Sequence, residues 1–322
     1  MRRRYPTLLC AVCLVGTSIS AWSQEYPRRP VRFVVPYAPG AINDAVARML
    51  AQRLTEVWAH PVIVDNRPGG GTIVGTEIVA RSAPDAHTLL LTSVAHAITP
   101  ALHKKLPYDV MRDFAYVTQV GYGPFVLAVH PGLGVDSVGG LIALARSKPD
   151  QLSYGSSGVG GGAHLATEIF KSMAGVRIVH VAYKGGGPAI VDTLTGQVHM
   201  TFATPLALGG HIKSGKLRAL AVSSARRARA LPDLPTMAEA CCPGYDAAPG
   251  WGVAVPAATP APIVERLHTA IVAILRQPDI VERYAAQSVE IAATSPAQAT
   301  AHMQAELQRW AKAVKFAQAK VD

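Results

Sequence analysis

The sequence contains few aromatic and few charged residues. Aromatic residues make up 6% and charged residues 16% of the 322-residue chain, whereas hydrophobic residues make up 49%. Proteins that bind nucleic acids usually combine a basic stripe with aromatic side chains that stack on bases. Here the positive charges are scattered, apart from a short run at residues 226–229, and no aromatic residues are interleaved with them. We therefore expect no nucleic-acid partner.

Cysteine is also scarce. Of the four cysteines, Cys10 and Cys13 lie at the start of the chain, and Cys241 and Cys242 are adjacent to each other. Beyond the start of the chain no cysteine or histidine spacing is typical of a metal site, so we expect neither a metal nor another cofactor. In an oxidising compartment the adjacent pair can form a strained vicinal disulfide, or both can remain thiols, and the sequence leaves both options open.

The first residues are typical of a secretory signal peptide. Residues 2–4 are arginines, residues 8–19 form an apolar run, and Ala21 and Ser23 are small residues at the cleavage positions. The run is too short to cross a bilayer of about 30 Å comfortably, so an uncleaved anchor is the weaker alternative. We predict that residues 1–23 are removed on export to the periplasm. Removing the three arginine charges from the formal +10 leaves +7, a diffuse field that suits small anions.

From residue 30 onward, β-branched segments alternate with amphipathic ones. Val31–Val35 predicts a buried strand, and residues 44–58 carry apolar side chains at helical spacing. The cycle of strand, turn and helix restarts near Phe125. Alternation of this kind is typical of parallel sheets covered by helices. The sequence thus predicts an α/β fold of two lobes, each a mostly parallel sheet flanked by helices.

The restart of the cycle also predicts where the lobes divide. One lobe would contain residues 24–124 plus 251–322, and the other would contain residues 125–250. The chain would cross between them near residues 125–129 and 251–255, and the C-terminal helices would return to the first lobe.

Two Gly-rich loops, residues 37–44 (the first loop) and residues 156–164 (the second loop), lead from a predicted strand into a predicted helix. Ligands of open α/β sheets bind beyond the carboxyl ends of strands, where a helix N-terminus offers unpaired N–H groups and partial positive charge. One such loop in each lobe could grip a carboxylate without Arg or Lys; alternatively, the glycines only make tight turns. The candidate residues are Tyr37, Ala38, Gly40, Ala41, Ile42, Asn43 and Asp44 in the first loop, and Ser156, Ser157, Gly158, Gly160, Gly161, Gly162 and His164 in the second.

Asp44 is the only carboxylate in these loops, so paired acid–base groups are absent from them. We expect it to cap its helix and to pair with Arg48, which follows four residues later.

Enzymatic interpretations of the second loop are weaker. Residues 158–163 match the GxGxxA pattern of dinucleotide sites, but no carboxylate follows at the end of the next predicted strand. Ser157 and His164 could act as nucleophile and base, yet no third partner is evident and the GxSxG elbow is missing. A helix N-terminus would also lower the basicity of His164. We expect a binding protein rather than an enzyme, with a serine hydrolase as the alternative.

The chain resembles the extracytoplasmic receptors of tripartite tricarboxylate transporters, the Bug/TctC family. The resemblance extends from Tyr26 to the C-terminus, and the order and spacing of its segments together make it specific. These segments are residues 26–40, 66–69, 84–85, 105–109, 113–114, 170–175, 179–185, 215–222 and 231–236.

The resemblance implies a Venus-flytrap fold, type II-like among periplasmic binding proteins, that closes on a small organic carboxylate without catalysis. In similar proteins the carboxylate is held by the two segments that map to the first and second loops. The distal end of the ligand would then meet His96, Ala97, Ala203 and Thr204. The implied partner is a membrane permease, a sensor kinase is the alternative, and we expect a monomer.

Two positions depart from the family pattern. The first loop of the family is richer in glycine, whereas this chain has Ile42 and Asn43. Members that bind amino acids can use an acidic residue where this chain has Ala203. Because an unpaired ammonium group in a closed cleft is costly, we predict a carboxylate ligand without an α-amino group.

Overall fold

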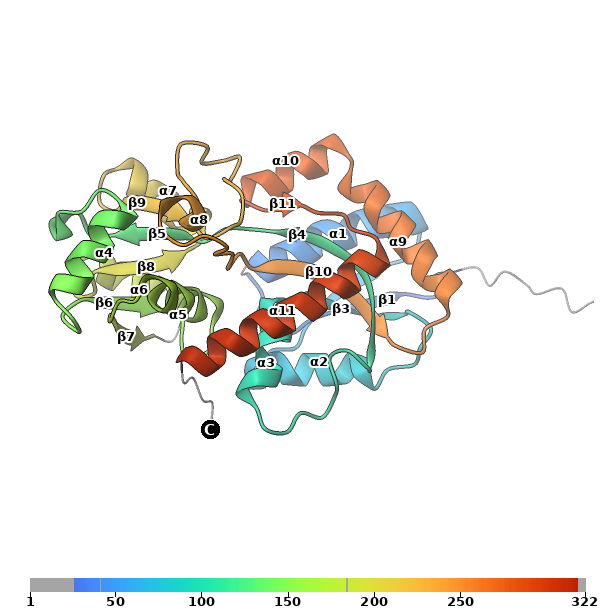
Figure 1. The fold of residues 1–322 in the computed structure, drawn as a ribbon. Coiled ribbons are helices and arrows are strands. Elements are labelled where there is room, and N and C mark those ends of the chain that lie inside the picture. Colours follow the sequence, from blue (N-terminus) through green and yellow to red (C-terminus); the bar gives the residue numbers. More distant parts are fainter. Residues whose placement is uncertain (1–25, 41, 184, 318–322) are drawn as a thin grey trace, which may run out of the picture.

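The computed structural model describes residues 26–40, 42–183 and 185–317. The predicted signal peptide and Ala41 of the first loop lie outside these residues. The described chain forms two mixed sheets with helices packed against them, and Figure 1 shows the two sheets in separate parts of the molecule.

Strands from both ends of the described chain form the larger sheet, which has six strands. They are β1 (Val31–Val35), β2 (Val62–Asn66), β3 (Thr88–Ser93), β4 (Phe114–Tyr122), β10 (Gly250–Pro256) and β11 (Glu290–Ile291). The order is β11-β4-β10-β3-β1-β2. Strand β1 is parallel to β2 and β3, whereas β10 is antiparallel to β3 and β4, and β11 is antiparallel to β4.

The smaller sheet has five strands, all from the middle of the chain. They are β5 (Val126–Val129), β6 (Ser153–Ser156), β7 (Val179–Ala182), β8 (Met200–Ala203) and β9 (Arg218–Val222). The order is β7-β6-β8-β5-β9, with β6 parallel to β7 and β8, and β5 antiparallel to β8 and β9.

The two-sheet α/β fold agrees with the sequence prediction. Most strands of each sheet run in one direction, and the opposed strands are β10 and β11 in the larger sheet and β5 in the smaller one. Each sheet receives one strand directly from the other. Strand β5 follows β4 after residues 123–125, and β10 follows the segment after β9. Such a strand enters the sheet at the edge where the parallel strands of that sheet end. It therefore runs antiparallel to them.

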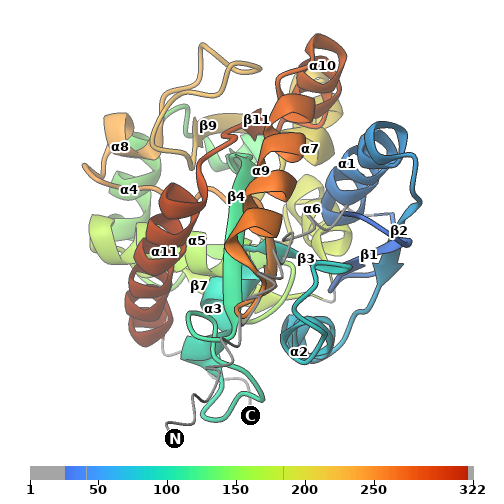
Figure 2. The ribbon, with the colours of Figure 1, turned by 90° about the vertical axis from the view of Figure 1, so that its right-hand side faces the viewer.

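Helices cover both faces of the larger sheet. Two hydrophobic clusters lie on its opposite faces. One joins it to α1 (Ile42–Trp58), α9 (Ala261–Leu275) and α10 (Pro278–Ala286). The other joins it to α2 (Ile73–Ala80), α3 (Val94–Leu102) and α11 (Pro296–Ala317). Figure 2 shows α1 and α2 on opposite sides of β1.

The helices associated with the smaller sheet come from the middle of the chain. They are α4 (Val138–Ser147), α5 (Gly162–Ala174), α6 (Gly186–Leu194), α7 (Pro205–Lys213) and α8 (Met237–Ala240). Single 3₁₀ turns cover Gly70–Thr72 and Pro131–Leu133. A disulfide joins Cys241 and Cys242 directly after α8. None of the described helices combines the length and apolarity that crossing a membrane requires.

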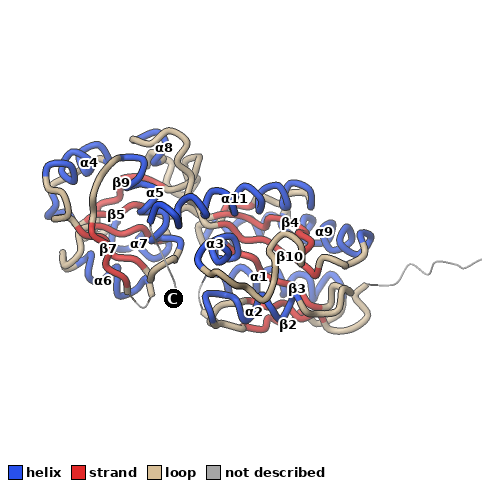
Figure 3. Tube along the Cα trace, turned by 60° about the horizontal axis from the view of Figure 1, so that its bottom comes forward, coloured by secondary structure: helices blue, strands red, loops and turns tan. Residues whose placement is uncertain are grey.

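The long helix α11 packs against elements of both sheets. It contacts α3 and β4 of the larger sheet, and it also contacts α5, which covers the smaller one. Figures 1 and 3 show it lying over the junction between the two parts. Its Trp310 is fully buried in a cluster that also contains Ala97 of α3 and Phe170 of α5. The division into lobes at residues 124–125 and 250–251 stays a prediction.

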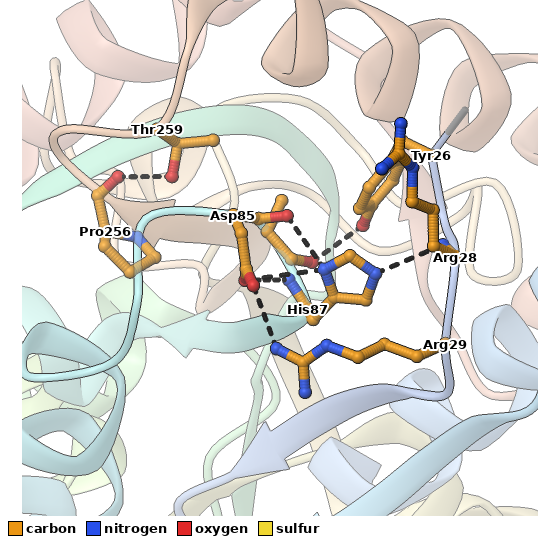
Figure 4. Close-up of polar contacts among 8 residues, drawn as sticks. Tyr26, Arg28, Arg29, Asp85, His87, Pro256 and Thr259 are labelled. Carbon is orange, nitrogen blue, oxygen red and sulfur yellow. Dashed lines mark hydrogen bonds and ion pairs between the residues drawn. The ribbon is translucent and has the colours of Figure 1, made fainter. Parts of the chain in front are cut away.

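The start of the described chain is bound to the turn before β3 (Figure 4). The Tyr26 hydroxyl donates to the Ala86 carbonyl at 2.7 Å, and Arg29 pairs with Asp85 at 2.8 Å. His87 accepts from the Arg28 backbone N–H at 3.3 Å. These contacts fix the chain immediately before β1, from whose end the first loop begins.

Replacing Trp310 with alanine should lower the free energy of unfolding by about 3–5 kcal/mol, because it leaves a cavity in a core that α11 shares with both sheets. Urea denaturation measures this change. The matched control is Lys312→Ala on the same helix, whose side chain is exposed and whose loss should cost less than about 0.5 kcal/mol. Equal effects of the two substitutions would contradict a core role for α11.

Candidate functional site

The first loop begins at the carboxyl edge of three parallel strands. Strands β1, β2 and β3 run in the same direction, so Tyr37, Asn66 and Ser93 lie at the same edge of the larger sheet. Helix α1 follows the first loop, and α3 begins directly after Ser93, whose hydroxyl caps it by accepting from the Ala95 N–H. This is the edge at which open α/β sheets bind ligands.

Asp44 organises the first loop from inside. Its side chain accepts from the Gly40 N–H at 3.0 Å, from Arg48 Nε at 2.8 Å and from Asn66 Nδ2 at 3.0 Å. Burial alone would raise the pKa of Asp44, but the hydrogen bonds from Arg48, Gly40 and Asn66 hold it below its ordinary value. The predicted pairing with Arg48 is confirmed. The Asp44 carboxylate is therefore engaged in shaping the loop and is not itself a binding group for an anion.

Other contacts fix the two ends of the first loop. The Tyr37 hydroxyl lies 2.5 Å from Ser93 Oγ, and burial raises the pKa of Tyr37 to about 12. Asn43 Oδ1 accepts from Trp251 Nε1 at 2.6 Å, so that amide oxygen is already engaged. Ile42 is half-buried and packs on the core of the larger sheet. Part of the Ile42 side chain therefore packs in that core and not in the opening of the loop.

The exposed part of the first loop is its middle. Ala38 and Gly40 are both exposed, and Gly40 has a φ of +90°, a conformation that favours glycine. Because its N–H is bound to Asp44, Gly40 is held in a defined orientation.

The second loop connects β6 to α5. Gly158 and Gly160 have φ values of +132° and +75°, which explains glycine at both positions. Helix α5 begins at Gly162, and its N-cap residue Gly161 supplies no side-chain hydrogen bond. The first N–H groups of α5 therefore lack a side-chain cap, and such groups form a ready site for a carboxylate.

Two stacked histidines support the second loop from behind. The rings of His164 and His180 are 4.0 Å apart and nearly parallel. His164 Nδ1 accepts from the Gly160 N–H at 3.0 Å, which places the proton of the neutral ring on Nε2. His180 Nε2 lies 2.7 Å from Ser156 Oγ. His180 thus contacts the start of the loop at Ser156, and His164 contacts its middle at Gly160.

A buried ion pair lies beside the histidines. Tyr154 stacks on His180 at 4.7 Å and donates to Glu168 Oε1 at 2.6 Å. Lys171 pairs with the same carboxylate oxygen at 2.6 Å. Burial, followed by His180 and Lys171, lowers the pKa of His164 to about 3. Both histidine pKa values are lowered, so the loop is supported by neutral rings at neutral pH.

The contacts do not favour a nucleophile in the second loop. In the described chain, no hydrogen bond joins Ser157 to His164, whose Nδ1 is engaged by the Gly160 backbone. Within the described residues of this loop, Ser156 contacts a histidine, His180, and it is only 1% exposed. A substrate could not reach its hydroxyl without moving the loop.

The remaining candidates lie in different environments. His96 is buried among Tyr108, Phe114 and Tyr116, and this burial lowers its pKa to about 3. Ala97 is 1% exposed. Ala203 and Thr204 are half-buried at the end of β8, where the Thr204 hydroxyl caps α7. Ligand contacts of these four residues stay predictions.

The second loop lies against α3 of the larger sheet. A methyl group added to Gly160 would lie 2.6 Å from Leu102 Cδ1, and one on Gly162 would lie 3.5 Å from Val94 Cγ1. The start of α5 is therefore next to the start of α3. These glycines permit close packing between the two parts of the molecule, a role that the sequence did not reveal. No group of three or more potential metal ligands occurs in residues 26–40, 42–183 and 185–317.

The comparison with known families decides the classification. The sequence model of the tripartite tricarboxylate transporter family receptor, TctC, matches residues 46–318. The chain belongs to this family. Among the curated TctC-family relatives, Protein BugT of Bordetella pertussis is 37% identical over 312 residues, which cover 96% of each chain. The resemblance seen in the sequence is thus confirmed, and the family is one of solute receptors.

Solved structures show the same fold. R. palustris Rpa4515 with adipate is 36% identical, with a TM-score of 0.81, and the match covers 92% of this chain and 100% of that one. The periplasmic binding protein BugD is 31% identical, with a TM-score of 0.77 and the same coverage. MatC from Rhodopseudomonas palustris with bound malate is 27% identical, with a TM-score of 0.76, over 90% of this chain and 100% of that one.

Replacing Asp44 with asparagine should lower the free energy of unfolding by about 1–3 kcal/mol. The asparagine NH₂ group would face N–H donors that now bind the Asp44 carboxylate, and at least one of them would lose its acceptor. Urea denaturation at pH 7 measures it. The exposed Asp136, replaced in the same way, should change stability by less than about 0.5 kcal/mol. A neutral effect of Asp44→Asn would show that its hydrogen bonds do not hold the loop.

The substitution His164→Asn should flatten the pH dependence of stability. Between its ordinary value of 6.5 and its folded value of about 3, His164 takes up a proton only when the chain unfolds. Stability therefore falls as the pH drops through this range, by up to about 1.4 kcal/mol per pH unit for one histidine. Asparagine can still accept from the Gly160 N–H but does not titrate.

The measurement is urea denaturation at intervals from pH 7 to pH 4, for the wild type and the variant. His103→Asn, which changes a half-buried histidine after α3, is the control and should keep the wild-type slope. If His164→Asn also keeps that slope, the histidine is not held neutral by the fold.

Proposed function

We propose that this protein is a periplasmic solute-binding receptor that captures a small organic carboxylate for a transporter of the tripartite tricarboxylate type. The predicted signal peptide and the TctC family support this location and role. The observation that carries the ligand assignment is the N-terminus of α5, which has no side-chain cap and lies directly against α3.

The chemistry of the two loops favours an anion held by backbone groups. The second loop offers the first N–H groups of α5, and the exposed Ser157 hydroxyl lies at the same end of β6. The first loop offers the exposed segment around Gly40. The negative charge of Asp44, which binds the Gly40 N–H, is already neutralised by Arg48. Charge-assisted hydrogen bonds from N–H groups to a carboxylate are stronger than neutral ones, so no cationic side chain is required.

The ligands of the relatives narrow the class. Rpa4515 was solved with adipate and MatC with malate, both small dicarboxylates. In the proposed site one carboxylate would lie at the α5 N-terminus, and the rest of the ligand would extend toward Ala203 and Thr204. Ala203 cannot pair with an ammonium group, so we infer a ligand without an α-amino group.

Binding of this kind needs no chemical step, and we infer that the protein is a receptor without catalytic activity. Movement of the predicted lobes would bring the first and second loops together around the ligand and exclude water. The family description favours a membrane transporter as the recipient of the ligand over a sensor kinase.

Calorimetric titration with adipate, malate and glutamate tests the proposal. A dicarboxylate present at 100 times its dissociation constant should also raise the free energy of unfolding by about 2.7 kcal/mol in a thermal-shift assay. Glutamate should bind at least about tenfold more weakly. Tight binding of glutamate with no binding of the plain acids would overturn the assignment.

The variant Ser157→Ala should weaken binding of the best dicarboxylate by about tenfold, since it removes a hydroxyl donor to a charged group. Ser147→Ala, at the exposed end of α4, is the matched control and should leave affinity unchanged. If both variants bind as the wild type does, the second loop is not the ligand site.

A further inference from the structure

A hollow lies where elements of both sheets meet. It has a volume of about 650 Å³ and lies between the segment that follows β9 and the helices α9 and α10. Its lining includes Tyr122, Arg226, Arg229, Arg276, Val281 and Glu290, and we call it the arginine groove. None of the candidate ligand residues lines it.

Three guanidinium groups in the arginine groove have no partner. Arg226, Arg229 and Arg276 are exposed, and in the described part of the chain none of their side chains forms an ion pair or hydrogen bond. Most other described arginines pair with a carboxylate or a carbonyl. The neighbouring Arg227 illustrates this, since it is bound to Glu239 at 3.0 Å and to the Pro232 carbonyl. Three guanidinium groups without an ion pair thus line one groove.

The backbone that carries these arginines is nevertheless held in place. Ser224 Oγ donates to the Arg226 carbonyl at 2.6 Å, and the Arg229 N–H donates to Glu290 Oε1 at 3.2 Å. The Tyr122 hydroxyl donates to the other oxygen of Glu290 at 3.2 Å. Glu290, the carboxylate that lines the groove, is therefore already hydrogen-bonded. The same contacts fix the backbone that carries Arg226 and Arg229.

The arginine groove is built from both parts of the molecule. Arg226 and Arg229 follow β9 of the smaller sheet, whereas Arg276 follows α9 and Glu290 lies in β11 of the larger sheet. Tyr122 is the last residue of β4, from which the chain crosses to the smaller sheet. A molecule lying in the groove would contact both parts at once.

We propose that the arginine groove docks an acidic segment of a partner protein. Three guanidinium groups on two sides of the hollow match several carboxylates along an extended chain. The apolar part of the lining, where Val281 is 39% exposed and Ile291 is half-buried, suits the apolar side chains of such a segment. This inference concerns a surface separate from the carboxylate site and does not depend on which acid the loops hold.

Fluorescence anisotropy with a labelled ten-residue polyglutamate peptide tests the proposal on the full mature chain. The triple variant Arg226→Gln, Arg229→Gln, Arg276→Gln should weaken peptide binding at least about tenfold, because it removes three ion pairs. The control is Lys104→Gln, Lys105→Gln, Lys148→Gln, which removes the same charge from exposed positions outside the groove and should change affinity less than about twofold.

Two results would overturn the proposal. If both triple variants lose the same affinity, the peptide responds to net charge and not to the groove. If submillimolar citrate displaces the peptide from the wild type but not from the groove variant, the hollow is a site for small polyanions. Dicarboxylate binding to each variant, measured by calorimetry, should equal that of the wild type, which separates a failure here from a failure of the proposed receptor function.

Discussion

The way in which the chain passes between the two sheets determines where the site lies. Strand β4 continues into β5, and β10 later enters the larger sheet from the opposite direction. Both entering strands are antiparallel to parallel neighbours, so the carboxyl ends of those neighbours lie at the junction in each sheet. Helix N-termini follow the parallel strands in both sheets. At this junction the start of α5 lies next to the start of α3.

Buried polar side chains fix the shape of both loops. Asp44 binds the first loop through Gly40, and His164 binds the second through Gly160. Both contacts run from a helical residue back to a glycine of the same loop. The loops can thus present backbone to a ligand while their shape is set by side chains that the ligand does not need to touch. The arginines without an ion pair that line the arginine groove lie outside both loops.

The sequence predicted elements whose pattern is local. The strand Val31–Val35, the helix after it and the pairing of Asp44 with Arg48 all follow from short-range spacing and are present. Strand β4 was not predicted, and its pairing with β10 and β11 identifies it in the structure. The antiparallel direction of β5 and β10 was not predicted, because it depends on which strands enter from the other sheet.

The candidate site was predicted unevenly. Ser93 and Asn66 were not among the predicted site residues, although each is the last residue of a parallel strand and ligands bind at the ends of such strands. Trp251 and His180 carry no such signal. Each contacts a loop that is distant in sequence, and only the folded chain brings them together.

Helix α11 limits the ways in which the two sheets can move. It packs on α3 and on α5, and its buried Trp310 belongs to one apolar cluster with residues of both. Swinging the sheets apart would expose that cluster to water at a cost of about 25 cal/mol for each Å² of apolar surface. Sliding α5 along α11 keeps the surface covered. A movement of the two sheets that keeps α11 packed on both α3 and α5 avoids this cost.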